Sequence, residues 1–90
     1  MLFMVIERFP NRDAEPVYRR LREQGRMMPA GLRYLGSWIE TNFDRCFQLM
    51  ECEDERLFAD WMANWSDLMD FEIVPVATSQ EIQNVMLPKT

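Results

Sequence analysis

The hydrophobic pattern of this chain alternates between two periods, and that alternation restricts its fold more than any other feature. The opening segment, LFMVIERF, is an apolar run of strand length, and a near-continuous apolar run is typical of a central strand covered on both faces. The next segment repeats apolar residues at three- and four-residue spacing, which is typical of an amphipathic helix. Strand-like and helix-like segments follow in the order β-α-β-β-α-β. These segments are residues 2–9, 14–28, 32–41, 45–52, 57–68 and 71–77.

Helix caps and breakers separate these segments. Asp13 is the expected N-cap of the first helix, and Pro16 is acceptable in its first turn. The cluster Pro29-Ala30-Gly31 is expected to end that helix. The triplet Asn42-Phe43-Asp44 is typical of a hairpin turn, and Asp54 can cap the second helix.

The order of the segments predicts an α+β fold. Two right-handed βαβ crossovers bring the first and third strands together in the centre. The expected architecture is a ferredoxin-like βαββαβ plait, a four-stranded antiparallel sheet with two helices on one face. Pro75 removes one ladder donor, so the last strand is expected at an edge or a strand end.

The chain divides into one domain, residues 1–78, and a short C-terminal helix and tail, residues 79–90. Thr78 and Glu81 have capping-box spacing, which predicts a helix through about Val85. The last residues, Leu87 to Thr90, are expected to be frayed.

Composition excludes several classes of function. Ten basic and fifteen acidic residues give a net charge of −5, and an acidic chain repels the phosphates of nucleic acid. The arginines between residues 12 and 33 are interleaved with acidic residues, which is typical of a solvated helix face. The apolar opening run is too short for a membrane span and follows no basic segment, so a cytoplasmic protein is expected.

The chain has no histidine and two cysteines, Cys46 and Cys52. They lie six residues apart in one expected strand, roughly 20 Å, which is too far for a disulfide. We expect free, buried thiols, no metal site and no cofactor. A nucleophilic Cys46 would lack its usual histidine partner.

The residues of the expected sheet divide between two faces. The purest apolar sets, Leu2, Met4 and Ile6 with Phe47, Leu49, Phe71 and Ile73, are expected under the helices. The opposite face would then carry Phe3, Val5, Glu7, Cys46, Gln48, Met50, Glu72, Val74 and Val76. A face this apolar usually marks an interface, so we expect a homodimer that pairs two sheets. Tyr34 and Trp38 share one parity of the second strand and are expected on one face, unless a bulge intervenes.

Apolar walls with a few converging polar groups are typical of a small-molecule cavity. The candidate pocket residues are Glu7, Tyr34, Trp38, Gln48, Glu72 and Trp61. Trp61 and Trp65 both lie on the apolar stripe of the second helix, where large aromatic residues are more often core than ligand contacts. Glu7 and Glu72 would be general bases if burial raised their pKa, or solvated strand-end residues otherwise.

Four segments together resemble a known family: MLFMVIERF, FDRCFQLMEC, ADWMANWSDL and DFEIVPV. The family consists of small bacterial proteins that carry a domain of unknown function, and it resembles the dimeric α+β barrel superfamily. The resemblance covers about residues 1–80 and implies a homodimer with a cleft between sheet and helices in each protomer. It implies no activity, because one fold hosts many functions. Haem degradation in that superfamily relies on a proximal histidine, which this chain lacks.

Three classes of function remain. The leading one is a small dimeric domain that binds a small apolar or aromatic molecule in a sheet–helix cleft. The second is a cofactor-independent monooxygenase-like or isomerase-like enzyme. The third is a structural or interaction domain that has no pocket and whose dimer interface is dry and fully packed.

Overall fold

The computed structural model describes residues 1–87, and it has the expected α+β class and segment order. The elements are β1 (Leu2–Arg8), the 3-10 turn η1 (Pro10–Arg12), α1 (Glu15–Gln24), β2 (Arg33–Ile39), β3 (Arg45–Glu51), α2 (Leu57–Met62), β4 (Asp70–Val76) and α3 (Ser79–Met86). No helix in this described part of the chain is long and apolar enough to cross a membrane.

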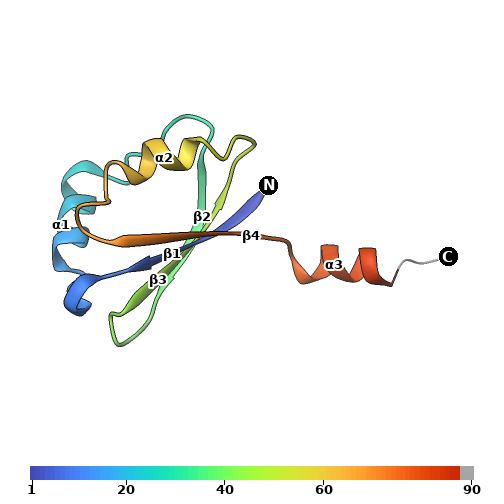
Figure 1. Cartoon of the computed structure of the whole chain (residues 1–90), viewed down its shortest axis with the longest axis horizontal. Helices are drawn as coiled ribbons and strands as arrows, with labels where there is room; N and C mark the ends of the chain where they lie inside the picture. The colour runs from blue at the N-terminus through green and yellow to red at the C-terminus, as the bar shows by residue number, and fades with distance from the viewer. Residues whose placement is uncertain (88–90) are drawn as a thin grey trace.

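The four strands form one antiparallel sheet in the order β2-β3-β1-β4. The first and third strands therefore lie in the centre, as predicted. The last strand is at an edge, where the missing donor of Pro75 is tolerated. Helices α1 and α2 both lie on one side of the sheet (Figure 1). The opposite side of the sheet is left open.

Both connecting helices are shorter than their apolar stripes predicted. Helix α1 has Pro16 in its first turn, as expected, but it ends at Gln24 because Gly25 turns the backbone to φ 70°. Asp13 is not its N-cap; the Asp13 Oδ1 accepts a hydrogen bond from the Glu15 amide at 3.2 Å, two residues on. Helix α2 ends at Met62, so Trp65 lies in the turns that follow it.

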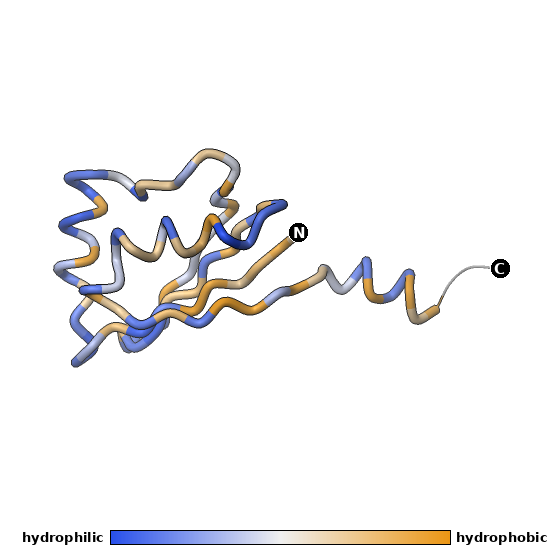
Figure 2. The backbone as a smooth tube through the Cα atoms, turned by 45° about the horizontal axis from the view of Figure 1, so that its top comes forward, coloured by the Kyte–Doolittle hydropathy of each residue, from blue (hydrophilic) through white to orange (hydrophobic). Residues whose placement is uncertain are grey.

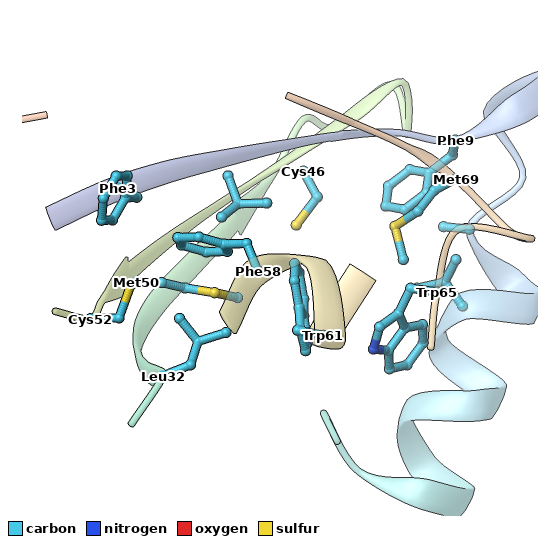
Figure 3. Close-up of a cluster of buried hydrophobic side chains, with 13 residues drawn as sticks. Phe3, Phe9, Leu32, Cys46, Met50, Cys52, Phe58, Trp61, Trp65 and Met69 are labelled. Atoms are coloured by element: carbon cyan, nitrogen blue, oxygen red, sulfur yellow. The ribbon is translucent and has the colours of Figure 1, made fainter. Parts of the chain in front are cut away.

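The core lies between the sheet and the two helices (Figure 3). Phe58 of α2 packs edge-on against Phe3 of β1, with ring centroids 5.1 Å apart. Trp61 packs edge-on against Phe71 of β4 at 5.3 Å. Of the side chains that are fully buried in this layer, the largest are those of Trp61, Phe3, Met50 and Val5.

The predicted facing of the two central strands is wrong. On β1 it is Phe3, Val5 and Glu7 that are buried under the helices, whereas Leu2, Met4 and Ile6 are only half-buried on the open face. On β3 the buried set is Cys46, Gln48 and Met50. On β4 the facing is as predicted, because Phe71 and Ile73 pair with Glu7 and Val5 and so share the helix-covered face.

The physical reason is that Phe3 and Phe71 on the covered face pack edge-on against aromatic residues of α2, and that the polar pair on this face is hydrogen-bonded. Glu7 and Gln48 share one hydrogen bond there, so their burial carries less than its full cost. The purest apolar set faces away from the helices instead. The apolar residues of the open face are Leu2, Met4, Ile6, Trp38, Phe47, Leu49, Val74 and Val76. Glu72 and the strand-end residues Arg8, Arg33, Arg45, Glu51 and Asp70 share this face.

A β-bulge in β2 separates Tyr34 from Trp38. Tyr34 pairs with Met50, but the next paired residue is Gly36, which opposes Leu49. The extra residue reverses the alternation. Tyr34 therefore shares the helix-covered side with Met50, whereas Trp38 pairs with Phe47 on the open face.

The predicted C-terminal helix is present as α3. The Thr78 Oγ1 accepts a hydrogen bond from the Glu81 amide at 3.1 Å, which is the expected cap. The helix continues away from the sheet and the other helices (Figure 1), and none of its residues is buried. The expected fraying of residues 88–90 lies outside the described residues.

Candidate functional site

Two polar side chains lie buried side by side on the helix-covered face. Glu7 of β1 and Gln48 of β3 expose only 2% and 8% of their surface. The Gln48 Nε2 donates a hydrogen bond to the Glu7 Oε1 at 2.5 Å. The other amide atom, Gln48 Oε1, is buried without a hydrogen-bond partner among the described residues. Buried polar atoms in folded proteins are nearly always paired, so this acceptor is a candidate contact for a bound group.

A small cleft lies over this pair. Its floor is Glu7 and Gln48, and its walls come from α1, α2 and the segments that follow these helices. The wall residues are Val17, Leu21, Arg26, Trp61, Trp65 and Met69. The cleft has a volume of about 30 Å³, which is about the volume per molecule in liquid water.

Arg26 holds one wall of the cleft in place. Its backbone carbonyl accepts hydrogen bonds from two indoles, the Trp61 Nε1 at 3.0 Å and the Trp65 Nε1 at 3.1 Å. Its guanidinium lies over the ring of Tyr34, 3.7 Å from the centroid, in the geometry of a cation–π contact. The segment after α1 is thereby anchored to α2 on one side and to β2 on the other.

Burial dominates the electrostatics of the floor. It raises the pKa of the Glu7 carboxyl above its ordinary value of 4.5, although hydrogen bonds from Gln48 and Cys46 and the charge of Arg26 oppose part of that shift. Glu7 is therefore a carboxyl group that holds its proton more tightly than a solvated one. Raised pKa values of this kind are typical of functional sites.

Cys46 adjoins the floor because it pairs with Glu7 across the two central strands. Burial, and then the charge of Glu7, raise the pKa of the Cys46 thiol to about 12. The thiol is therefore protonated at neutral pH and is not a nucleophile. Cys46 and Cys52 are both free and buried, as predicted.

The structure brings together three of the six predicted pocket residues. Glu7, Gln48 and Trp61 line the cleft. Tyr34 lies at its rim through its contact with Arg26. Trp38 is 59% exposed on the open face, and Glu72 pairs with Ile6 on that same face, so neither belongs to the cleft.

Five wall residues were not predicted as a site: Val17, Leu21, Arg26, Trp65 and Met69. Trp65 was interpreted as core, and its spacing of four residues from Trp61 was the available signal. Arg26 contributes through its carbonyl, which every residue carries, so its side-chain type gave no signal. Met69 lies between the turns that follow α2 and the start of β4, so no periodic pattern marks it.

The described part of the chain contains no cluster of metal-binding side chains. Among residues 1–87, no three His, Cys, Asp or Glu side chains lie together as a metal site requires. The polar groups of the cleft floor are one carboxyl and one amide, and the protonated thiol of Cys46 adjoins them. What this set can do by itself is accept or donate hydrogen bonds and transfer a proton.

Comparison with known proteins assigns the chain to a family. A family model described as Domain of unknown function (DUF3303) matches residues 1–90, the whole chain, so the chain belongs to this family. No curated protein matches the chain.

Proposed function

We propose that this member of the DUF3303 family is a homodimeric protein that binds a small molecule in the cleft between its sheet and its helices. The observation that carries the proposal is the buried, unpaired Gln48 Oε1 beside the protonatable Glu7. A bound donor group would satisfy this acceptor and remove the cost of leaving it unpaired.

The lining of the cleft defines the chemistry of the ligand. Gln48 Oε1 can accept a hydrogen bond from an N–H or O–H group of the ligand. Trp61 and Trp65 provide apolar and aromatic surface around it. The ligand is therefore a small, mainly apolar or aromatic molecule with one donor group. The present volume of about 30 Å³ admits only the polar end of such a molecule. Met69 is unbranched and adaptable, so a change of its rotamer is the simplest way to admit the rest.

The open face supports the homodimer. Four strands of seven residues, at about 3.3 Å per residue and about 4.8 Å between strands, project an area of roughly 440 Å². The accessible area of corrugated side chains exceeds this projection, which brings it toward the about 800 Å² that each partner buries in a standard interface. Ion pairs at the edges of the face, Arg33 with Glu51 and Arg45 with Glu40, resemble the polar rim of an interface.

The proposed dimer corresponds to the dimeric α+β barrel superfamily. Each protomer would be a ferredoxin-like plait whose open sheet face is closed by the sheet of the other. Two observations support this classification: the antiparallel sheet has β1 and β3 in its centre, and both connecting helices lie on one side of it. The two free thiols fit a bacterial protein of the reducing cytoplasm.

A second candidate is an isomerase-like enzyme that acts without a cofactor. The raised pKa of Glu7 favours it, because a general base works best with a pKa near the working pH. Glu7 would remove a proton from one carbon of a bound substrate and return it to another, so the reaction needs no oxidant. This candidate requires the same ligand in the same cleft.

The binding proposal is tested by identifying what the purified protein carries. We expect mass spectrometry after denaturation to release a small molecule from the wild-type protein and from Glu72→Gln. Glu72 is the matched control because it is a carboxylate on the neighbouring strand that faces the open side. Glu7→Gln and Gln48→Leu should release less or none.

Equal release from all four proteins would place the ligand outside the cleft. No release from any of them, combined with a dimer, would favour the interaction-domain class instead. If a substrate is found, Glu7→Gln should lower turnover by a larger factor than it lowers binding, since the amide keeps the shape of the side chain but cannot accept the proton.

A further inference from the structure

The C-terminal helix α3 exposes an apolar stripe that no residue in the described part of its own chain covers. Ile82, Val85 and Met86 recur at three- and four-residue spacing, and Leu87 follows them. Their exposed fractions are 46%, 73%, 72% and 75%. The opposite side of the helix is polar, where Gln80 Nε2 donates to Asn84 Oδ1 at 3.0 Å. Figure 2 shows the alternation of hydrophobic and hydrophilic residues along α3.

A helix of this length needs a packing partner. Helix α3 has eight residues, and isolated helices shorter than about 12–15 residues are marginal in water. Its cap at Thr78 is in place, but no residue of α3 is buried. An amphipathic stripe of this kind is stabilised mainly by packing. The partner must therefore be supplied from outside the described fold.

We propose that the apolar stripe of α3 packs on a second copy of this chain, as an arm that extends the homodimer interface. This proposal rests on the dimer proposed above. In a two-fold interface each protomer presents the same surface, so two arms pack reciprocally and each covers one end of the partner's open face.

The arm is continuous with the open face. Leu2 and Val76 of that face line a surface groove of about 340 Å³, and Glu81 in the first turn of α3 lines the same groove. A protein bound to the open face at this end would therefore also reach the first turn of α3. A second copy is the partner that brings both an apolar sheet face and an apolar helix stripe to this surface.

The connection to β4 directs α3 away from its own sheet. Only Ala77 and Thr78 separate Val76, the end of β4, from the first residue of α3. Thr78 is extended, with φ −68° and ψ 153°, and it forms the cap. Packing on its own open face would require a reversal within these two residues. Packing on a second copy requires no change in them.

The first test places the same charge on opposite sides of α3 in the full-length chain. We expect Val85→Asp to raise the dimer dissociation constant by at least about tenfold, measured by sedimentation equilibrium. Asn84→Asp is the matched control on the polar side and should stay within about twofold of the wild type. Circular dichroism of both variants verifies that the domain is folded.

A wild-type dimer that both variants leave unchanged would overturn the arm and leave the homodimer standing. A monomeric wild type would overturn the arm and the homodimer together. The two proposals are therefore distinguishable by the wild-type mass and the Val85→Asp result.

The second test separates a partner from a fold-back onto the same chain. A photoreactive phenylalanine analogue is placed at position 85, and ¹⁴N-labelled protein is mixed with ¹⁵N-labelled protein until the subunits exchange. Irradiation should produce cross-linked peptides that join light to heavy chains, with partners from the open face or the groove beside α3. Cross-links found only within one isotope would overturn the proposal.

Discussion

The two faces of the sheet differ in a way that reverses the simplest interpretation of hydrophobicity. The face that the helices cover contains a buried carboxyl and a buried amide, Glu7 and Gln48. On the face that neither α1 nor α2 covers, the central strands present Leu2, Met4, Ile6, Phe47 and Leu49, with charged residues only at the strand ends. A chain that only needed to fold would bury the second face and expose the first. The reversed arrangement is the observation behind both proposals, a ligand site on the covered face and a dimer interface on the open face.

The largest expected contrast in stability is between a tryptophan of α2 that packs on the covered face and a tryptophan that lies on the open face. Trp61 is 1% exposed and packs against Phe71 beside the cleft, so Trp61→Ala should lower the free energy of unfolding by about 3–5 kcal/mol. Trp38 is 59% exposed on the open face, so Trp38→Ala should change the unfolding of the monomer by less than about 1 kcal/mol. Denaturant unfolding at low protein concentration measures both. A similar loss of unfolding free energy in the two variants would contradict this difference between the faces.

A charge on the open face should affect association more than folding. Leu49 is half-buried and pairs with Met4 on the central strands of this face. Leu49→Asp should raise the dimer dissociation constant by at least about 100-fold, or about 2.7 kcal/mol, because the carboxylate would be buried in the interface without a partner. Size-exclusion chromatography across a dilution series measures the shift. The folded monomer should retain its circular dichroism spectrum.

The pH dependence of stability should isolate the buried carboxyl. Burial raises the pKa of Glu7 in the folded state, so the folded protein binds this proton more tightly than the unfolded chain. The contribution of Glu7 to the free energy of unfolding is fully present below about pH 4.5 and falls as the pH rises through the folded pKa. Subtracting the pH profile of Glu7→Gln from that of the wild type should reveal this decline.

A difference profile for Glu7→Gln that rises with pH would mean that the folded pKa of Glu7 lies below its ordinary value. That result would contradict a desolvated carboxyl in the cleft.

The smallest expected signal is the reactivity of the two thiols. Cys46 and Cys52 are 7% and 3% exposed, and burial raises the pKa of each. Alkylation with iodoacetamide at pH 8 should leave both unmodified in the native protein and label both after denaturation. Rapid native labelling of Cys46 would show that the cleft floor is open to solvent.

Most of the fold was predictable because the hydrophobic period and the turn residues agree. The order of the elements, the central position of β1 and β3, and the edge position of β4 at Pro75 are confirmed. The end of α1 was not predicted correctly, because the apolar stripe continues past Gly25 in residues that pack on the core without being helical. The bulge before Gly36 leaves no trace in the pattern either.

The candidate site was predictable only in part, for a related reason. Strand parity grouped Glu7 with Gln48 correctly, since both alternate in register on paired strands. It could not say which face the helices cover, because both faces are apolar enough to be buried. Contacts through a backbone carbonyl, such as that of Arg26 with two indoles, have no side-chain signature in a sequence.

The most direct test of this account is the mass of the wild-type protein in solution by sedimentation equilibrium. One chain has a mass of 10.8 kDa, so two chains have 2 × 10.8 = 21.6 kDa. We predict a species of twice the chain mass at micromolar concentration, which Leu49→Asp converts to the mass of one chain. A wild-type protein that stays at 10.8 kDa across the concentration range would contradict the account, because its apolar open face would then be exposed to water.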